Sequence, residues 1–129
     1  RVRSSAASDV YKRQIDYAIK KDGRTILLIE CKHCKQNLDL HNTQLSKYYA
    51  ASNARFGVLT NGIEYRFYAD LDKTNIMDEK PFLVVNMLDL SDADIEEMKK
   101  FHKSCYNESE ILSTAKELQM MIHCFTEWK

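Results

Sequence analysis

The chain has 129 residues, of which 44% are hydrophobic, so it can form one domain of ordinary size around a hydrophobic core. Nineteen Lys and Arg residues balance nineteen Asp and Glu residues, and this net charge of zero excludes a strong overall attraction to nucleic acid. Because the sequence has no apolar run of about 18 residues and no signal peptide, we expect no membrane segment and a cytoplasmic location.

Residues 1–14, RVRSSAASDVYKRQ, show neither helix nor strand periodicity. We interpret this segment as a non-native extension, of the kind that a translated adaptor or assembly scar produces. We therefore do not expect it to be part of the fold.

Residues 15–32, IDYAIKKDGRTILLIECK, predict two strands joined by a tight turn. Residues 15–20 alternate, so one face is expected to carry Ile15, Tyr17 and Ile19, and the other Asp16 and Ala18. The turn spans residues 21–24 and contains Gly23, which can adopt the positive φ that such turns need. Asp16 is thereby placed early on the first strand.

The second strand, residues 25–32, is continuously apolar before its end, as expected for a strand buried on both faces. It ends in Glu30, Cys31 and Lys32. Because side chains alternate, Glu30 and Lys32 point the same way, about 7 Å apart along the backbone. Cys31 points to the other face, into the layer that covers the sheet. Charge at the end of a buried strand is costly and usually has a function.

Metal-assisted phosphodiester chemistry is the simplest function for these charges. The carboxylates of Asp16 and Glu30 suit a hard cation such as Mg²⁺, whose coordination is completed by water and substrate phosphate. Such an ion polarises the phosphoryl oxygen and lowers the pKa of a bound water, while Lys32 can orient that water or stabilise developing negative charge. The alternative is a structural ion pair at the end of the sheet, which a Glu-x-Lys tripeptide on its own favours.

The cysteines allow a different kind of metal site. Cys31 and Cys34 form a C-x-x-C, and His102 lies three residues before Cys105, so a zinc site made of these four residues is an alternative. Cys105 and Cys124 are nineteen residues apart and do not form a second close pair. We expect reduced, partly buried thiols instead.

Residues 41–53 predict a helix. One face is expected to carry Leu45, Tyr49 and Ser52. Gln44 and Tyr48 share another face at i, i+4 spacing. Spacing alone favours a Tyr48 that packs on the sheet and a Gln44 that is exposed.

Further strands are predicted after this helix. Residues 56–60 form a short apolar run, and Asn61-Gly62 directly after it is the strongest hairpin signal in the chain. The side chains of residues 63–69 alternate between two faces, which predicts a strand close to the sheet edge. Its aromatic residues Tyr65 and Phe67 are expected to lie in the protein core. Residues 70–80 predict a loop and residues 82–87 a last strand.

Two helices are predicted at the C-terminal end. Ser91, with Asp94 in the capping-box position, begins a helix through Lys103. Asn107 caps the second. The apolar stripes of the two helices comprise Ile95, Met98 and Phe101 in the first and Ile111, Ala115, Leu118, Ile122 and Phe125 in the second. Because their polar faces mix both charges, we expect these helices to pack on the core or on a further region rather than to bind nucleic acid.

The order of these motifs resembles a nuclease superfamily. Asp16, then Glu30-Cys31-Lys32 fourteen residues later, then a helix with Gln44 and Tyr48 resembles the PD-(D/E)xK nucleases. The run ILLIECKHCKQNLDLHNTQLSKYYAASNARFGVLTNGIEYRFYADLD is similar to the N-terminal nuclease domain of type I restriction enzyme R subunits. The resemblance covers residues 15–90.

The resemblance implies an α/β domain of the restriction-endonuclease type: a mixed β-sheet with a flanking helix and two appended C-terminal helices. It implies Mg²⁺-dependent endonuclease cleavage of double-stranded DNA. The residues it assigns are Asp16 and Glu30 as metal ligands, the carbonyl of Cys31 as a further ligand, Lys32 as the residue that assists the attacking water, and Gln44 and Tyr48 as supports of the site.

The resemblance also implies how the chain is organised. Residues 15–90 would be the nuclease core and residues 91–129 a helical extension. We expect the chain to be a fragment, because in the superfamily a helix and a strand precede the part that matches. No G-x-x-x-x-G-K-[ST] motif occurs, so we expect no ATP site on this chain, and the specificity and modification subunits of a restriction complex are the expected partners. The alternative is a catalytically silent DNA-binding or assembly module of the same fold.

Overall fold

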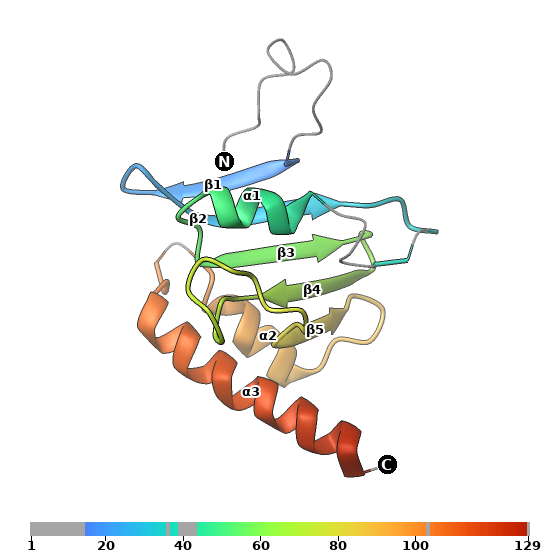
Figure 1. The fold of residues 1–129 in the computed structure, drawn as a ribbon. Helices are drawn as coiled ribbons and strands as arrows, with labels where there is room; N and C mark the ends of the chain where they lie inside the picture. The colour runs from blue at the N-terminus through green and yellow to red at the C-terminus, as the bar shows by residue number, and fades with distance from the viewer. Residues whose placement is uncertain (1–14, 36, 39–43, 103, 129) are drawn as a thin grey trace.

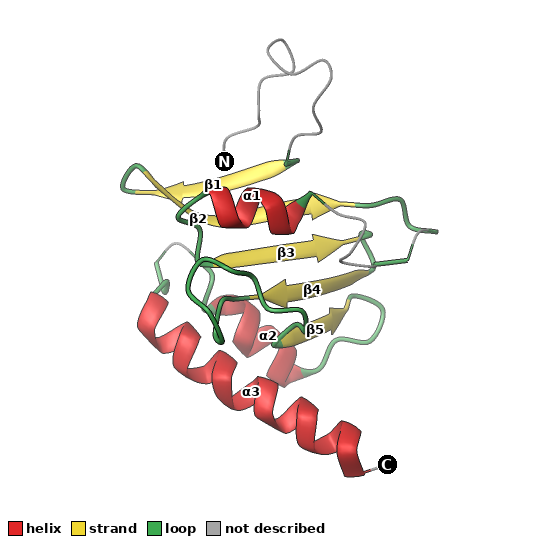
Figure 2. Ribbon diagram, viewed as in Figure 1, coloured by secondary structure: helices red, strands yellow, loops and turns green. Residues whose placement is uncertain are grey.

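A mixed β-sheet flanked by helices forms the protein (Figures 1 and 2). The computed structural model describes residues 15–35, 37–38, 44–102 and 104–128. Its elements are β1 (Tyr17–Lys21), β2 (Arg24–Cys31), α1 (Leu45–Ala51), β3 (Phe56–Thr60), β4 (Glu64–Tyr68), β5 (Leu83–Asn86), α2 (Asp92–Lys99) and α3 (Glu108–Trp128). The predicted fold class, a mixed sheet with one flanking helix and two C-terminal helices, is confirmed.

The strands lie in the order in which they follow one another in the sequence, β1-β2-β3-β4-β5. All neighbouring strands are antiparallel except β2 and β3, which are parallel and are connected through α1. The β1–β2 turn has positive φ at Asp22 (53°) and Gly23 (79°), the backbone that a tight hairpin requires. Both hairpins predicted from glycine-containing turns, before β2 and after β3, are confirmed.

Two hydrophobic clusters cover the two faces of the sheet, because consecutive residues of β2 and β3 point to opposite sides. Leu28 and Leu59 pack with Leu45 and Tyr49 of α1 on one face. Leu45 and Tyr49 are fully buried. A helix of seven residues is not stable in water by itself, so this packing holds α1 in place.

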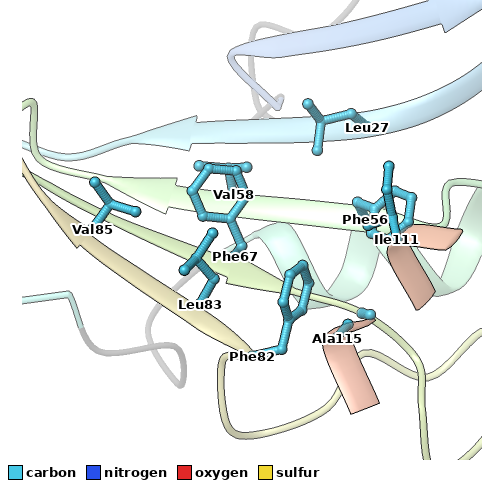
Figure 3. Close-up of a cluster of buried hydrophobic side chains, with 10 residues drawn as sticks. Leu27, Phe56, Val58, Phe67, Phe82, Leu83, Val85, Ile111 and Ala115 are labelled. Atoms are coloured by element: carbon cyan, nitrogen blue, oxygen red, sulfur yellow. The ribbon is translucent and has the colours of Figure 1, made fainter. Parts of the chain in front are cut away.

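The cluster on the opposite face joins the sheet to the C-terminal helices (Figure 3). Figure 3 shows Ile111 and Ala115 of α3 beside side chains from four strands and from Phe82. Met98 of α2 and Phe101 pack against the same cluster. The aromatics of β4 lie in the core as predicted, since Phe67 is buried and Tyr65 packs against this cluster.

The helix caps agree with the sequence. Ser91 and Asp94 form a reciprocal capping box at the start of α2, and the side chain of Asn107 accepts a hydrogen bond of 3.1 Å from the N–H of Glu110 at the start of α3. Part of the predicted stripe of α2 is wrong, because Ile95 is 38% exposed. In α3, Ile111 and Ala115 are buried as predicted, whereas the side chains of Ile122 and Phe125 lie outside the described part of the chain.

The ends of several elements differ from the prediction. Asp16 lies in a bend before β1, and this bend sends Ile15 to the cluster of α1 while Ile19 packs on the other face. The prediction that Ile15 and Ile19 share a face is therefore wrong. Helix α1 is shorter than residues 41–53, and α2 ends at Lys99 rather than Lys103. The expected extension, residues 1–14, lies outside the described residues.

Two ion pairs of Arg55, which directly precedes β3, join the loop after β4 to α3. The side chain of Asp70, which has no exposed surface, lies 3.4 Å from the Nη2 of Arg55, and the Nη1 of Arg55 lies 3.0 Å from Glu108 in the first turn of α3. The loop between β4 and β5, which the sequence predicted over residues 70–80, is thus anchored by a buried carboxylate. No helix in the described residues is long and apolar enough to cross a membrane.

Candidate active site at the end of β2

Asp16 reaches the end of β2 through the register of the β1–β2 hairpin. Tyr17 is paired with Ile29, so the preceding residue, Asp16, comes next to Glu30. The Oδ2 of Asp16 accepts a hydrogen bond of 2.7 Å from the backbone N–H of Cys31. This N–H belongs to the peptide that links Cys31 to Glu30, so the carboxylate of Asp16 is bound to the main chain directly after Glu30.

The carboxylate of Glu30 is the buried part of the site. The residue is 6% exposed. Its Oε1 accepts a hydrogen bond of 2.9 Å from the backbone N–H of Gln44, and its Oε2 lies 3.1 Å from the Nζ of Lys32. Since burying a charged carboxylate is costly unless it is paired and hydrogen-bonded, these two contacts explain how Glu30 is held in its place.

Lys32 follows the last residue of β2 and continues its alternation. Its backbone N–H donates to the carbonyl of Thr60 in β3 at 2.7 Å, and its side chain is 19% exposed. The prediction that Glu30 and Lys32 point the same way is confirmed. The contact between Lys32 and Glu30 is also what the alternative, a purely structural ion pair at the end of the sheet, would show. The second carboxylate, Asp16, is the feature that favours a metal site.

Cys31 is exposed, and the prediction that it points into the covering layer is wrong. The reason is that β2 ends at this residue, beyond Ile29, which still packs against the cluster on that face. Partial burial raises the pKa of the Cys31 thiol, and the negative charges of Asp16 and then Glu30 raise it further. The thiol is therefore under the influence of both carboxylates.

The described residues contain no group of three His, Cys, Asp or Glu side chains that could hold a metal ion. Cys31, Cys34 and Cys105 are free thiols at the surface, and the side chain of Cys124 lies outside the described residues. Within the part of the chain that the structure describes, a further protein ligand beside Asp16 and Glu30 would come from the main chain.

Gln44 is the residue that caps α1, and it presents its backbone N–H to Glu30. Tyr48, one turn later, is half-buried and packs against the cluster that contains Leu45 and Tyr49. The structure thus brings Gln44 to Glu30 through the main chain, and it places Tyr48 where the packing interpretation expects it.

Arg66 of β4 is a residue that the sequence analysis did not connect with the site. Its Nη1 donates a hydrogen bond of 2.7 Å to the carbonyl of Leu38, and its Nε donates to Glu64. Leu38 lies in the connection between β2 and α1. Alternation in β4 indicates the face of Arg66, but no local signal points to a partner 28 residues away.

The chemistry of the donors at the end of β2 is uniform. Asp16, Glu30 and the carbonyl of Cys31 all offer oxygen atoms, which suit Mg²⁺ or Mn²⁺ rather than metals that prefer sulfur and nitrogen. The ammonium of Lys32 lies beside one of these groups, 3.1 Å from the Oε2 of Glu30. The residues present therefore fit a hard divalent cation next to a positively charged group.

Comparison with known proteins adds one match. A family model described as type I restriction enzyme R protein N terminus (HSDR_N) matches residues 2–76, a range that includes most of the segment set aside above as an extension and all of β1 to β4. No curated protein and no solved structure was matched.

Proposed function

Because the chain belongs to the family of the type I restriction enzyme R protein N terminus, we propose that it is the Mg²⁺-dependent DNA endonuclease domain of a type I restriction system. The observation that carries this proposal is the gathering of Asp16, Glu30 and Lys32 at the end of β2. The substrate is the phosphodiester backbone of double-stranded DNA.

Asp16 and Glu30 would hold the Mg²⁺ ion, with the carbonyl of Cys31 as a further ligand. When bound, the ion would supply Lewis-acid polarisation of the scissile phosphate and a bound water of lowered pKa. The hydrogen bonds from Cys31 and Gln44 fix the two carboxylates by main-chain donors, so the ligands are oriented before an ion arrives.

Lys32 would act on the attacking water and on the charge that develops at the phosphate. In the structure its ammonium is paired with Glu30 at 3.1 Å and retains some solvent exposure, 19% of the side chain. An ammonium in this position can donate a hydrogen bond to a water or to a phosphate oxygen that lies at the end of β2. Loss of this donor removes stabilisation of the transition state while the carboxylates remain.

Family membership places the chain in the context of a restriction complex. We propose that specificity and modification subunits select the DNA site, since the chain has a net charge of zero and no overall basic field of its own. Cleavage without sequence preference is then expected from this chain alone.

Nicking of supercoiled plasmid DNA in Mg²⁺ tests the proposal. We expect nicking by the wild-type chain, none above background without a divalent cation, and rates reduced by about 100-fold or more in Asp16→Ala and Lys32→Ala. Lys20→Ala and Asp72→Ala, at exposed positions away from the site, are the matched controls and should cut normally. A folded wild-type chain that binds DNA without nicking would instead favour the silent DNA-binding or assembly module.

A further inference from the structure

Charge is unevenly distributed along the chain, although the net charge is zero. Residues 15–60, which contain β1, β2, α1 and β3, carry seven Lys and Arg but four Asp and Glu. Residues 89–129, which contain α2 and α3, carry five Lys and Arg but nine Asp and Glu. The first part is therefore basic and the C-terminal helical part is acidic.

These two parts meet different faces of the sheet. Helix α1 packs with Leu28 and Leu59 on one face, whereas Met98 of α2 and Ile111 of α3 pack on the other (Figure 1). A polyanion such as DNA is attracted to basic surface and repelled by acidic surface. The side of the sheet that α1 covers is therefore the side that favours DNA.

The lysines on this side differ from those of α2 in their partners. In α2, the Nζ of Lys100 lies 3.0 Å from the carboxylate of Glu97. Lys35, after β2, and Lys47, in α1, are exposed and form no ion pair among the described residues. An ammonium without an ion pair can bind a phosphate without first giving up a contact within the protein.

Lys35 lies in the segment that leaves the candidate active site. Residues 32–35 follow β2 and project beyond the ends of the strands (Figure 1). Within this segment, the backbone N–H of Lys35 donates a hydrogen bond of 3.2 Å to the Nδ1 of His33. Lys32 pairs with Glu30, so Lys35, three residues later, is the next lysine along the chain from the site.

Lys47 lies close to the site on α1. Three residues before it, the backbone N–H of Gln44 donates to the Oε1 of Glu30. Residues three apart lie on the same side of a helix and are separated by about 4.5 Å along its axis. Lys47 is therefore within one helical turn of the residue that contacts Glu30.

We propose that Lys35 and Lys47 bind the phosphate backbone of duplex DNA, so that the duplex lies along the α1 side of the end of β2 and the acidic C-terminal helices face away from it. The choice of DNA as the ligand rests on the proposed function. Because phosphate contacts do not read bases, this surface binds different sequences equally. Partner subunits that select the DNA site then supply the sequence preference.

Fluorescence anisotropy with a short labelled DNA duplex tests this surface on the full chain. EDTA keeps divalent cations away, so binding is measured without cleavage, and the KCl concentration is varied. Lys35→Gln and Lys47→Gln should each weaken binding by about fivefold at low salt and reduce the slope of log Kd against log salt by about 1. Circular dichroism checks that each variant is folded.

Two control variants remove the same charge elsewhere. Lys20 is exposed at the opposite end of the β1–β2 hairpin from Asp16, and Lys116 is exposed on α3. Lys20→Gln and Lys116→Gln should bind the duplex within about twofold of the wild type. Equal losses in all four variants would show that net charge alone decides binding and would overturn the inference. A wild-type chain that does not bind the duplex at low salt would overturn it as well.

NMR spectra with the duplex added show where it binds. The amide signals of residues 32–35 and of α1 should shift, and those of α3 should not. Shifts that centre on α3 would contradict the proposed surface.

Plasmid nicking separates this inference from the proposed function. If the wild type binds DNA through Lys35 and Lys47 but does not nick it in Mg²⁺, the proposed catalysis fails and the binding surface stands. If the wild type nicks DNA while Lys35→Gln and Lys47→Gln bind and cut like the two controls, the proposed function stands and the binding surface fails.

Discussion

The backbone N–H of Cys31 donates a 2.7 Å hydrogen bond to the Oδ2 of Asp16. Asp16 lies in the bend before β1 and Cys31 ends β2, so this bond fixes the aspartate at the end of the strand that carries Glu30. The donor is main chain, and the bond therefore depends on the hairpin register rather than on the thiol. A register shift of one residue would remove it.

Gln44 should tolerate loss of its side chain better than loss of its backbone N–H. Its φ of −88° is close to the range of proline, so Gln44→Pro removes the donor to Glu30 without breaking α1. We expect Gln44→Pro to bind Mg²⁺ more weakly and to nick plasmid DNA about tenfold more slowly, whereas Gln44→Ala keeps the bond and loses less. Calorimetric titration with Mg²⁺ and the nicking rate check this. Equal defects in both variants would assign the role to the side chain instead.

The thiol of Cys31 should react slowly for an exposed cysteine. Burial, Asp16 and Glu30 raise its pKa, so at pH 8 less of it is thiolate than in an ordinary thiol. Alkylation followed by mass spectrometry should show Cys31 modified more slowly than Cys34, and Asp16→Asn should speed up its modification. Faster reaction of Cys31 than of Cys34 in the wild type would contradict this electrostatic account.

Arg55 should be important for stability. Arg55→Met leaves the fully buried carboxylate of Asp70 without its cation and should lower the free energy of unfolding by about 3 kcal/mol. Lys99→Met, which breaks the exposed pair with Glu96, is the matched control and should cost less than about 0.5 kcal/mol. Urea denaturation followed by circular dichroism measures both. Similar losses in the two variants would show that burial of Asp70 does not decide the cost.

Tyr106 should make the fold sensitive to alkali. Its hydroxyl is buried and has no hydrogen-bond partner among the described residues, and burial followed by the charge of Glu108 raises its pKa to about 12. In the unfolded chain, a tyrosine side chain has a pKa of about 10. The folded chain thus holds this proton more tightly, so the contribution to stability is full below pH 10 and is lost as the pH rises toward 12.

Tyr106→Phe removes this ionisation. We expect the variant to be as stable as the wild type or more stable at pH 7, because a buried hydroxyl without a partner is lost, and to lose less stability between pH 10 and 12. Tyr49, whose pKa burial and the charge of Asp70 also raise, leaves part of the alkaline loss in place. Urea midpoints at several pH values measure the difference. A steeper alkaline loss in the variant would rule this assignment out.

Local sequence patterns predicted those elements whose ends coincide with a turn sequence or a capping residue. Strand β3 has the bounds predicted from its apolar run, which ends at the turn of Asn61 and Gly62. The cap of α2 follows from Ser91 and Asp94. The common face of Glu30 and Lys32 follows from alternation, because both lie at the end of the same strand.

Contacts that depend on register or on distant segments could not be predicted in this way. The bond of Gln44 to Glu30 uses a backbone N–H, which every residue type except proline has, so its side chain gives no sign of it. The partners of Arg66 and Arg55 lie on other elements of the fold. Asp70 was predicted only to lie in a loop, because a charged residue in a segment without periodicity gives no sign that it is buried.

Titration with Mn²⁺, which shares the oxygen ligands of Mg²⁺, is the most direct test of the site. The paramagnetic ion broadens the NMR signals of nearby amides. We predict that broadening at low Mn²⁺ centres on the amides of Asp16, Glu30, Cys31 and Gln44, and that Asp16→Asn and Glu30→Gln each abolish it. Broadening that centres elsewhere on the chain, or that survives both substitutions, would contradict a divalent cation shared by these two carboxylates.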